Sequence, residues 1–479
     1  MPESPNHDRK PGMAPRDNER ADMRITTVRI LVQSILFGLF VAFCLVTTFS
    51  ALNDYPALAS RVGKFLEIDP LIAIATAITT HTVYRGLVWA LLVVVLTLFL
   101  GRVFCSWICP FGAIHHFTGW LFNRRHTKAR IESNQYRPMY AFKYCVLLFC
   151  LVAAFFSTLQ IGLLDPICLL HRSVTTALLP ALNTPPVMQK GWEPLGWSGF
   201  GEPKYHQLGW IIGFLALVLV SLNLAIPRFF CRALCPLGAL LGLFSRFALW
   251  RIDRDPTRCN GCKLCERSCG GACDPCSRLR KSECLVCFNC IEDCPSGALR
   301  FAFLAAPAGE VTYPDVPARR AVLAAVAGAL FYPFTRASAR TTRDFSSKVI
   351  RPPGTVEEQE FLERCVKCGQ CMRVCPTNVI QPAAFESGVE GLWTPIMNFR
   401  MGYCQLNCTA CGHVCPTGAI QRLTVAQKHG LAPLPDALGG RGPVRLGTAH
   451  YDLGRCLPWA KNIPCVVCEE VCPTSPKAV

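Results

Sequence analysis

The chain has 479 residues, more than one compact core usually holds, so we expect two or three structural units. Hydrophobic residues make up 51% of the chain, charged residues make up 17%, and the mean hydropathy is +0.30, which excludes an ordinary soluble protein and indicates that part of the chain lies in lipid. The net charge is +17, but the arginines cluster at the ends of apolar segments, so the positive-inside rule accounts for them and we expect no nucleic-acid partner.

Four apolar segments are long enough to cross a bilayer, and each is predicted to be a transmembrane helix. They are 25–50, 81–100, 139–164 and 208–226. Arginine and lysine are concentrated in the arm 1–24, between the second and third segments and after the fourth segment, which predicts that these parts are cytoplasmic. The other two loops balance their charges and are expected to face outward. We therefore expect a four-helix membrane domain over 25–250, surrounded by membrane lipid.

One motif, C-x3-C-P, closes the second and the fourth predicted span on the cytoplasmic side. Its cysteines are Cys105 and Cys109 in the first copy and Cys231 and Cys235 in the second. Residues four apart lie on one face of a helix, so the two helix ends could bring four thiolates together around a metal or a cluster. A purely structural helix-terminating motif, with reduced or disulfide-linked thiols, is an equally good interpretation because spacing alone does not separate the two.

Residues 251–304 are predicted to form a cytoplasmic ferredoxin domain with two [4Fe–4S] clusters, because two cysteine runs there have the bacterial ferredoxin spacing. On that pattern the fourth cysteine of each run serves the neighbouring cluster, so the ligand sets are Cys259, Cys262, Cys265 and Cys294, and Cys284, Cys287, Cys290 and Cys269. Gly270 follows Cys269 where proline is usual, and Cys273 and Cys276 are competing thiols, so the fourth ligand of the second set stays open. A zinc ribbon is the alternative, but it uses two separate C-x2-C pairs.

Residues 305–350 are predicted to form a linker that contains a signal or anchor segment. Arg319 and Arg320 precede an apolar run over 321–334 and the triplet Ala337-Ser338-Ala339, an arrangement that resembles a twin-arginine export signal with its cleavage site. Such export suits a cluster-binding domain, because that route carries folded proteins. The alternative is a linker whose alanine-rich helix packs on the cytoplasmic module.

Residues 351–479 are predicted to form a second ferredoxin-like domain with two or three clusters, so that the chain holds four or five. The two regular runs are Cys365, Cys368, Cys371 and Cys375, and Cys404, Cys408, Cys411 and Cys415. The extra residue between Cys404 and Cys408 leaves the other intervals intact. The third run has an irregular first interval and consists of Cys456, Cys465, Cys468 and Cys472.

Two weaker candidates are quinol contacts: His115 and His116 after the first C-x3-C-P motif, and the segment 165–172 at the outer end of the third span. Both are more simply interpreted as interfacial residues. The sequence has no glycine-rich nucleotide loop, no Ser/His/Asp arrangement and no haem-attachment motif, so hydride chemistry and hydrolysis have no candidate residues.

These motifs together resemble a known family of ferredoxin-type proteins. Residues 25–300, with four spans, two C-x3-C-P repeats and a double ferredoxin motif, resemble NapH of periplasmic nitrate reduction and its relatives MauN and NosR. Residues 317–479, with the twin-arginine signal and the run that ends Cys465-Val-Val-Cys468-Glu-Glu-Val-Cys472-Pro473, resemble NapG and MauM. The chain thus resembles a fusion of both components. Exported members usually carry four cluster motifs, so we expect that this sequence is truncated or that one terminal cluster has been lost.

The resemblance implies an α-helical membrane protein with four transmembrane helices and a candidate fifth, joined to α+β bacterial ferredoxin-like [4Fe–4S] domains. It also implies a multi-pass protein of the bacterial inner membrane with a periplasmic C-terminal domain. Its expected function is electron transfer from quinol to a periplasmic c-type cytochrome or to a reductase such as nitrate reductase. The alternative is an accessory electron donor for the maturation or activation of a periplasmic metalloenzyme.

Overall fold

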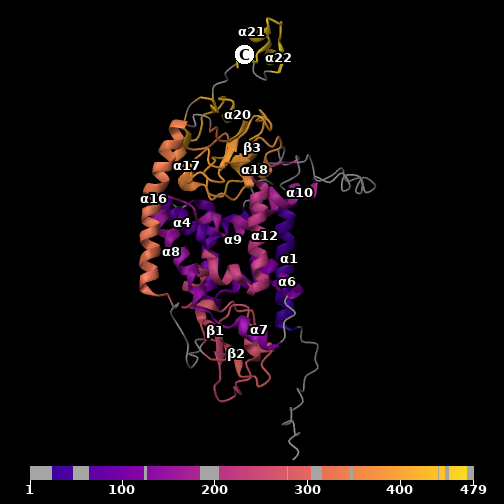
Figure 1. The fold of residues 1–479 in the computed structure, drawn as a ribbon, viewed down its shortest axis with the longest axis vertical. Helices are drawn as coiled ribbons and strands as arrows, with labels where there is room; N and C mark the ends of the chain where they lie inside the picture. Colours follow the sequence, from indigo (N-terminus) through magenta and orange to yellow (C-terminus); the bar gives the residue numbers. More distant parts are fainter. Residues whose placement is uncertain are drawn as a thin grey trace, which may run out of the picture.

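The computed structural model describes residues 24–46, 64–82, 84–122, 127–183, 204–277, 279–303, 316–345, 349–440, 442–447 and 452–471. These residues form three layers along the long axis of the molecule (Figure 1). A helical domain lies in the middle. A first cysteine module, residues 250–303, lies at one end, and a second cysteine module, residues 349–447, lies at the opposite end.

The helical domain is built from two halves that repeat one order of elements. In each half an apolar helix, a short helix that begins Asp-Pro, a second apolar helix, a π-helical turn and a short helix that begins with proline follow one another. The first half contains α1 (Ile25–Val46), α3 (Lys64–Glu67), α4 (Pro70–Thr80), η2 (Arg85–Trp89), α5 (Ala90–Leu100), η3 (Phe104–Ile108) and α6 (Pro110–Phe122). The second contains α7 (Thr127–Asn134), η4 (Pro138–Ala141), α8 (Phe142–Phe155), η5 (Ile161–Leu163), α9 (Pro166–Ser173), η6 (Val174–Leu178), α10 (Leu179–Asn183), α12 (Gly209–Ala225), η8 (Phe230–Leu234) and α13 (Pro236–Ser245).

Two of the four predicted spans form helices that are long and apolar enough to cross a membrane, Ile25–Leu45 and Thr127–Phe155. The other two form shorter apolar helices, Gly86–Leu100 and Gly209–Ala225. The predicted bounds were too generous at one end, since helix α8 stops at Phe155 where the prediction continued to 164. Residues 47–50 of the first predicted span lie outside the described residues.

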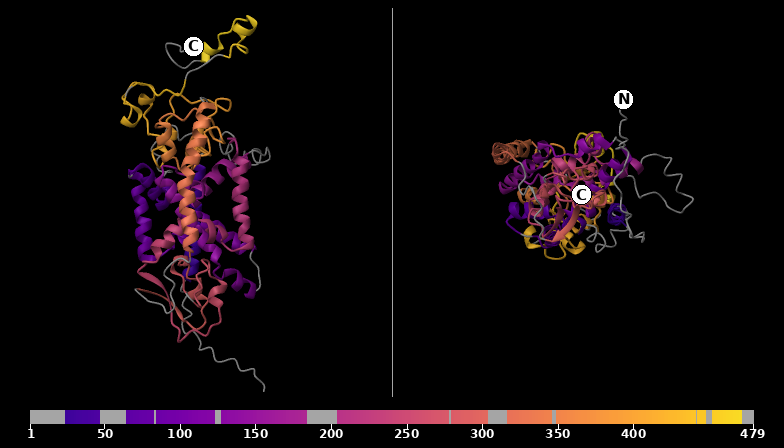
Figure 2. Two further views of the ribbon diagram at one scale, coloured as in Figure 1. Left: turned by 60° about the vertical axis from the view of Figure 1, so that its left-hand side comes forward. Right: turned by 90° about the horizontal axis from the view of Figure 1, so that it is seen from below.

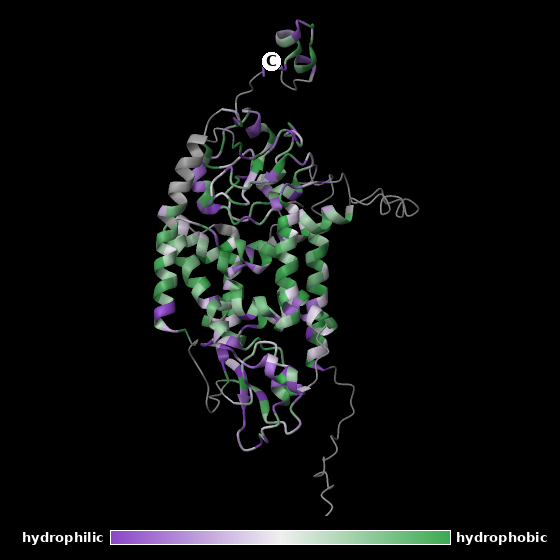
Figure 3. Ribbon diagram, in the orientation of Figure 1, coloured by the Kyte–Doolittle hydropathy of each residue, from purple (hydrophilic) through white to green (hydrophobic). Residues whose placement is uncertain are grey.

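The helical layer exposes large hydrophobic side chains all along its outer helices, and Figure 3 shows this layer as an apolar zone between two more polar ends. Soluble proteins rarely expose apolar surface on this scale, because each such side chain loses free energy in water. The exposed side chains include Leu31 and Ile35 of α1, Leu91 and Leu92 of α5, Trp210 and Phe214 of α12, and Leu323 and Leu330 of the linker helix described below. This surface favours a lipid environment for the layer.

The loops that were predicted only to face outward contain two buried helices, α4 and α9. Asp69 and Asp165 cap the two helix starts, and Pro70 and Pro166 occupy the first helical position, where proline costs nothing because its missing N–H would be unpaired. All eight residues of α9 are buried, as is one side of α4. The balanced charge of these two loops predicted the side of the membrane that they face, but it did not predict that parts of them are buried in the helical domain.

The first cysteine module has one antiparallel strand pair, β1 (Trp250–Arg254) with β2 (Leu299–Phe303), in which Trp250 pairs with Phe303. Between the strands lie the cysteine loops and the short elements α14 (Leu264–Arg267), η9 (Lys281–Glu283) and α15 (Asn289–Glu292). Ile252, Leu279 and Leu299 form its small core together with the cysteines. A core this small makes the cysteine sites a large part of the module's interior.

The second cysteine module has its own strand pair, β3 (Ile380–Pro382) with β4 (Pro395–Met397). Its other elements are α17 (Glu358–Arg364), α18 (Gln370–Val374), α19 (Ala410–His413), α20 (Val425–Lys428) and η10 (Asp436–Leu438). Helices α21 (Leu457–Lys461) and α22 (Val467–Val471) lie apart from it in Figure 1. Both modules thus combine short helices with one two-stranded sheet, as the ferredoxin motifs predicted.

The predicted linker forms one long helix, α16 (Ala318–Phe345), which runs beside α8 along the whole helical layer (Figures 1 and 2). A Cβ atom on Gly328 would lie 2.7 Å from the carbonyl oxygen of Phe149, so glycine permits this close packing. The rings of Phe149 and Phe331 lie 5.4 Å apart. The alternative interpretation, a helix packed on the first module, was therefore wrong about the packing partner. Export and cleavage at this segment stay predictions.

Candidate functional site: the thiol groups of the two cysteine modules

The structure brings the cysteines of the first module together in the crossed pattern that the ferredoxin spacing predicted, and the second module shows the same pattern. In the first module Cys259, Cys262, Cys265 and Cys294 line one cavity. Cys284, Cys287 and Cys290 interact electrostatically with one another and with Cys269. In the second module Cys365, Cys368, Cys371 and Cys415 line a second cavity, and Cys411 interacts with Cys404, Cys408 and Cys375. We call these groups thiol sites 1, 2, 3 and 4, in this order.

Three of the cysteine loops share one backbone conformation. In C-x-x-C-x-x-C, the residues directly before and after the second cysteine have positive φ: Gly261 and Lys263, Val286 and Phe288, and Lys367 and Gly369. Alternation between right-handed and left-handed conformations turns successive amide N–H groups toward one point, which suits an anionic group. Four of these six residues are not glycine, so the loops hold backbone strain of the kind that occurs at functional sites.

Burial governs the protonation of the thiols in the second module. It raises the pKa of the Cys365 thiol to about 11 and that of Cys368 to about 12. The thiolate is the form that binds metal, so a bound cationic centre would offset the cost of burying these negative charges. The chemistry and arrangement of sites 1 to 4, four cysteines each with a shared cavity at sites 1 and 3, therefore fit iron–sulfur clusters.

The first module carries an additional thiol at each of its sites. Cys276 lines the cavity of site 1 beside its four cysteines. At site 2 the sulfur of Cys273 lies 3.4 Å from that of Cys269, and the two thiols hydrogen-bond. The hydrogen bond from Cys273 lowers the pKa of Cys269 to about 7 and raises that of Cys273, so Cys269 is the better thiolate donor. The competition expected from the sequence is thus present in the structure.

We expected the two cysteines of each C-x3-C-P motif to lie on one face of an α-helix, and the structure shows that they do not. In both copies the first cysteine is in a π-helical turn, and the second, in extended conformation, ends that turn before the proline. The thiol of Cys235 accepts a hydrogen bond from the amide of Gly238, 3.2 Å away. All four thiols nevertheless lie within electrostatic range of one another. We call these four cysteines the membrane-face thiols.

The residues between the membrane-face thiols hold the first module. Ser106 Oγ donates to the carbonyl of Leu285 at 2.7 Å, and Trp107 Nε1 donates to that of Val286 at 3.1 Å. In the second copy Arg232 donates to the carbonyl of Cys269 at 2.9 Å. The two C-x3-C-P turns therefore bind, by hydrogen bonds, the backbone segments that carry the cysteines of site 2.

A buried ionic cluster reinforces this contact. Glu283, which directly precedes Cys284, pairs with Lys143 of α8 and accepts a hydrogen bond from the Tyr144 hydroxyl at 2.9 Å. Arg102 lies 3.7 Å from the same carboxylate and donates to the carbonyl of Ser282 at 2.6 Å. Lys143, Arg102 and Glu283 are all nearly inaccessible to solvent, so the carboxylate compensates two buried cations.

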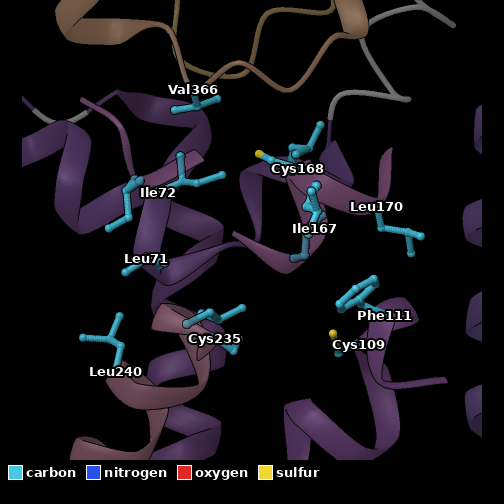
Figure 4. Packing of buried hydrophobic residues seen from close by; sticks show 14 of the residues in the cluster. Leu71, Ile72, Cys109, Phe111, Ile167, Cys168, Leu170, Cys235, Leu240 and Val366 are labelled. Atoms are coloured by element: carbon cyan, nitrogen blue, oxygen red, sulfur yellow. The ribbon is translucent and has the colours of Figure 1, made fainter. Parts of the chain in front are cut away.

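The second module contacts the opposite end of the helical domain through site 3. His171 Nδ1 lies 2.9 Å from the carbonyl oxygen of Cys368, and Arg172 donates to that of Lys367 at 3.1 Å. Val366 and Cys368 belong to the same apolar core as Leu71 and Cys168 of α4 and α9, and Figure 4 shows Val366 above this core. Both modules thus present a cysteine loop to the helical domain.

The third run of the C-terminal part is not gathered into such a site. Cys456, Cys465 and Cys468 are at least partly exposed, and Cys472 lies outside the described residues. No described cysteine forms a disulfide bond. Among the described residues no group of three or more His, Cys, Asp or Glu side chains is arranged to hold a single metal ion.

Of the weaker histidine candidates, His115 is buried within the helical domain and His116 is half-buried. The ring of His115 packs against Phe111 and Phe230, and no hydrogen-bond partner reaches its nitrogens in the part of the chain that is described. His116 Nε2 lies 3.5 Å from a guanidinium nitrogen of Arg29. Sequence reasoning missed the contacts of Ser106, Trp107 and Glu283, since no sequence motif marks them apart from their position beside cysteines.

Comparison with known proteins supports the iron–sulfur interpretation. Residues 82–128 and 207–254 match a family described as 4Fe-4S binding domain, and residues 364–419 match one described as 4Fe-4S dicluster domain. The first family covers the two C-x3-C-P turns and the second covers thiol sites 3 and 4. No solved structure matches the chain.

Three relatives show how the likeness is distributed. An uncharacterised protein of Methanocaldococcus jannaschii is 26% identical over 284 residues, which are 58% of this chain and 88% of the relative. The methylamine utilization ferredoxin-type protein MauM of Methylorubrum extorquens is 32% identical over 28% of this chain and 54% of its own length. The regulatory protein NosR of Pseudomonas aeruginosa is 27% identical over 44% of this chain and 28% of its own length. The predicted likeness to MauM and NosR is confirmed, whereas the fusion of two components stays a prediction.

Proposed function

We propose that this protein is a membrane-bound iron–sulfur electron-transfer protein of the quinol dehydrogenase type. It passes electrons from quinol to an acceptor on the far side of the membrane, a c-type cytochrome or a reductase such as nitrate reductase. The observation that carries this proposal is the docking of two cysteine modules, each through a cysteine loop, on opposite ends of one apolar helical domain. This arrangement suits electron movement across a bilayer better than electron storage on one side.

Thiol sites 1 to 4 would each hold one [4Fe–4S] cluster, which supplies one-electron transfer when bound. The chain contributes thiolates, converging amides and burial, which are the levers by which a protein sets a cluster potential. The membrane-face thiols would hold a further cluster, a proposal supported by the 4Fe-4S family match over both turns. The third cysteine run would hold one more cluster only if its four thiols came together. This run consists of Cys456, Cys465, Cys468 and Cys472.

Iron analysis tests this assignment. Purified anaerobically, the protein should contain about 16 iron atoms if only sites 1 to 4 are loaded, and about four more for each further cluster. Replacing Cys105 and Cys231 together by serine should lower the iron content by about four if the membrane-face thiols hold a cluster. Unchanged iron content in that double variant would show that these thiols are structural.

Quinol oxidation is tested in anaerobic proteoliposomes. A reduced quinol analogue should bleach the visible absorbance of the clusters, and dithionite should define full reduction. If the quinol leaves the clusters oxidised although their potentials permit reduction, the protein is not a quinol dehydrogenase. Such a result would favour the alternative, an accessory electron donor for a metalloenzyme. The observation that favours this alternative is the likeness of the chain to the regulatory protein NosR.

A further inference from the structure

The two halves of the helical domain meet at a pair of buried aspartates. Asp69 caps α4 by accepting a hydrogen bond from the amide of Leu71 at 2.8 Å. Asp165 caps α9 in the same way, accepting from the amides of Ile167 at 3.0 Å and Cys168 at 2.9 Å. Figure 4 shows these helix starts, marked by Leu71 and Ile167, within the apolar core below Val366. Each cap uses only one oxygen of its carboxyl group.

The second oxygen of each carboxyl group takes no part in its helix cap. Both side chains are fully buried, and no donor among the described residues reaches Oδ2 of Asp69 or Oδ1 of Asp165. The two carboxyl groups lie within hydrogen-bonding range of each other. Two ionised carboxylates can only accept hydrogen bonds, and two buried negative charges at contact are strongly unfavourable. A proton between the two oxygens satisfies both and leaves one negative charge on the pair.

Few ionisable groups face the pair. Its titratable neighbour is the Cys168 thiol, which also lies within range of Cys368 and Arg172. Helices α5, α12 and α13 carry no charged side chain. The other elements that pack on α4 and α9 carry charged or titratable side chains, but each of these contacts a different group. The ion pairs are Lys143 with Glu283, Arg364 with Glu360, and Glu67 with Arg422. His171 contacts Cys368, and His115 packs against Phe111 and Phe230.

The pair lies near thiol site 3, because Cys168 interacts electrostatically with both Asp165 and Cys368 and belongs to the same apolar core as Cys368. An electron added at site 3 adds a negative charge in a poorly polarisable interior, where charges interact more strongly than in water. The carboxyl pair can take up a compensating positive charge. His171, whose Nδ1 lies 2.9 Å from the carbonyl oxygen of Cys368, is the competing proton acceptor, and a carboxyl signal distinguishes the two.

We propose that Asp69 and Asp165 share one proton and bind a second proton when thiol site 3 accepts one electron. The proton comes from water and converts the pair from a single negative charge to neutral, while the electron from the quinol-fed chain adds one negative charge at site 3. The total charge of this end of the helical domain thus stays constant. The inference rests on the proposed function only in that site 3 is a redox site.

The experiment uses the full chain with its clusters loaded, reduced by dithionite so that it does not depend on quinol. The infrared difference spectrum, reduced minus oxidised, should show gain of a protonated carboxyl C=O band in the wild type. Asp69→Asn and Asp165→Asn should each abolish this band, since asparagine still caps a helix but holds no proton. Asp255→Asn is the matched control, because Asp255 caps an exposed turn in the first module and should leave the band unchanged.

The reduction potential of site 3 provides a second readout that needs no variant. In the wild type it should fall by about 59 mV per pH unit where uptake of the second proton is coupled, since one proton accompanies one electron. The clusters of the first module serve as a reference within the same molecule. A pH-independent potential in the wild type, or a carboxyl band that survives in both asparagine variants, would overturn the proposal. Failure of quinol reduction alone would contradict the proposed function and leave both readouts interpretable.

Discussion

At the scale of single residues, thiol site 2 offers a choice between Cys269 and Cys273 as the fourth donor. Cys269 has the lower pKa because Cys273 donates a hydrogen bond to it, and the thiolate is the donor form. We expect that Cys269→Ser loses the cluster of site 2, with about four fewer iron atoms per chain. The matched variant, Cys273→Ser, should retain the iron, because a hydroxyl can still donate to the Cys269 sulfur. Iron analysis with electron paramagnetic resonance checks both, and equal iron loss would show that both thiols are required.

Glu283 supplies a second prediction at this scale. Its carboxylate compensates Lys143 and Arg102 in a fully buried setting. Glu283→Gln keeps the shape but leaves two buried cations unpaired, so the free energy of unfolding should fall by about 3–5 kcal/mol. Denaturant unfolding of the solubilised protein, followed by cluster absorbance, measures this.

The control for Glu283 is the exposed pair of Asp452 with Arg455, whose side chains are 64% and 85% exposed. Asp452→Asn should cost less than about 1 kcal/mol, since exposed ion pairs contribute little. Similar losses in both variants would mean that Glu283 does not act through charge compensation.

The sequence predicted which cysteines form sites far better than it predicted what surrounds them. Fixed spacing determines the loops, because the ligands of one cluster are mostly local in the chain. Ser106, Trp107 and Glu283 act across long chain separations, and nothing in their local sequence states the partner. The Asp69–Asp165 pair was missed for the same reason, although both residues stand in matching Asp-Pro steps that a search for repeats would have found.

At the scale of elements, the short turn η5 determines how closely the second module approaches the helical domain. A Cβ atom on Gly162 would lie 2.0 Å from the carbonyl oxygen of Val366. Gly162→Ala should therefore displace the cysteine loop of site 3 and reduce stability by about 1–3 kcal/mol. Amide hydrogen exchange in 349–440 should rise, with exchange in the first module unchanged.

Gly38→Ala in α1 is the control for Gly162→Ala, because a Cβ atom there meets nothing within 4 Å. We expect this change to be neutral or stabilising by about 0.5–1 kcal/mol, since alanine favours a helix. If exchange in 349–440 is unaffected by Gly162→Ala, the close contact at Val366 does not hold the second module.

The helices were predicted by their apolar length, and that signal fails for short buried helices. Helix α4 has 11 residues and α9 has eight, too few for a span, so hydropathy left them inside loops. Their Asp-Pro starts were the available local signal. The π-helical turns at the C-x3-C-P motifs were invisible to spacing, because an interval of four residues is compatible with several helical geometries.

At the scale of the whole molecule, the positions of the two modules predict opposite sides of the membrane. A fluorescent protein that matures only in the cytoplasm should report when fused after Phe303, and a phosphatase active only outside should report when fused after Gly440. A cytoplasmic signal at both positions would contradict transmembrane electron transfer. The arginine distribution predicted this topology, while the packing of α16 against α8 required the structure.

Helix α16 has a consequence for assembly as well as for topology. Because it joins the two modules along α8, the second module docks on η5 and α9 as part of the same polypeptide. Tethered partners meet at an effective concentration that reaches the millimolar range for short connections, whatever the number of molecules in the membrane. Even a weak contact at site 3 would therefore remain occupied after transient release, and dilution in lipid should not separate the two ends of the molecule.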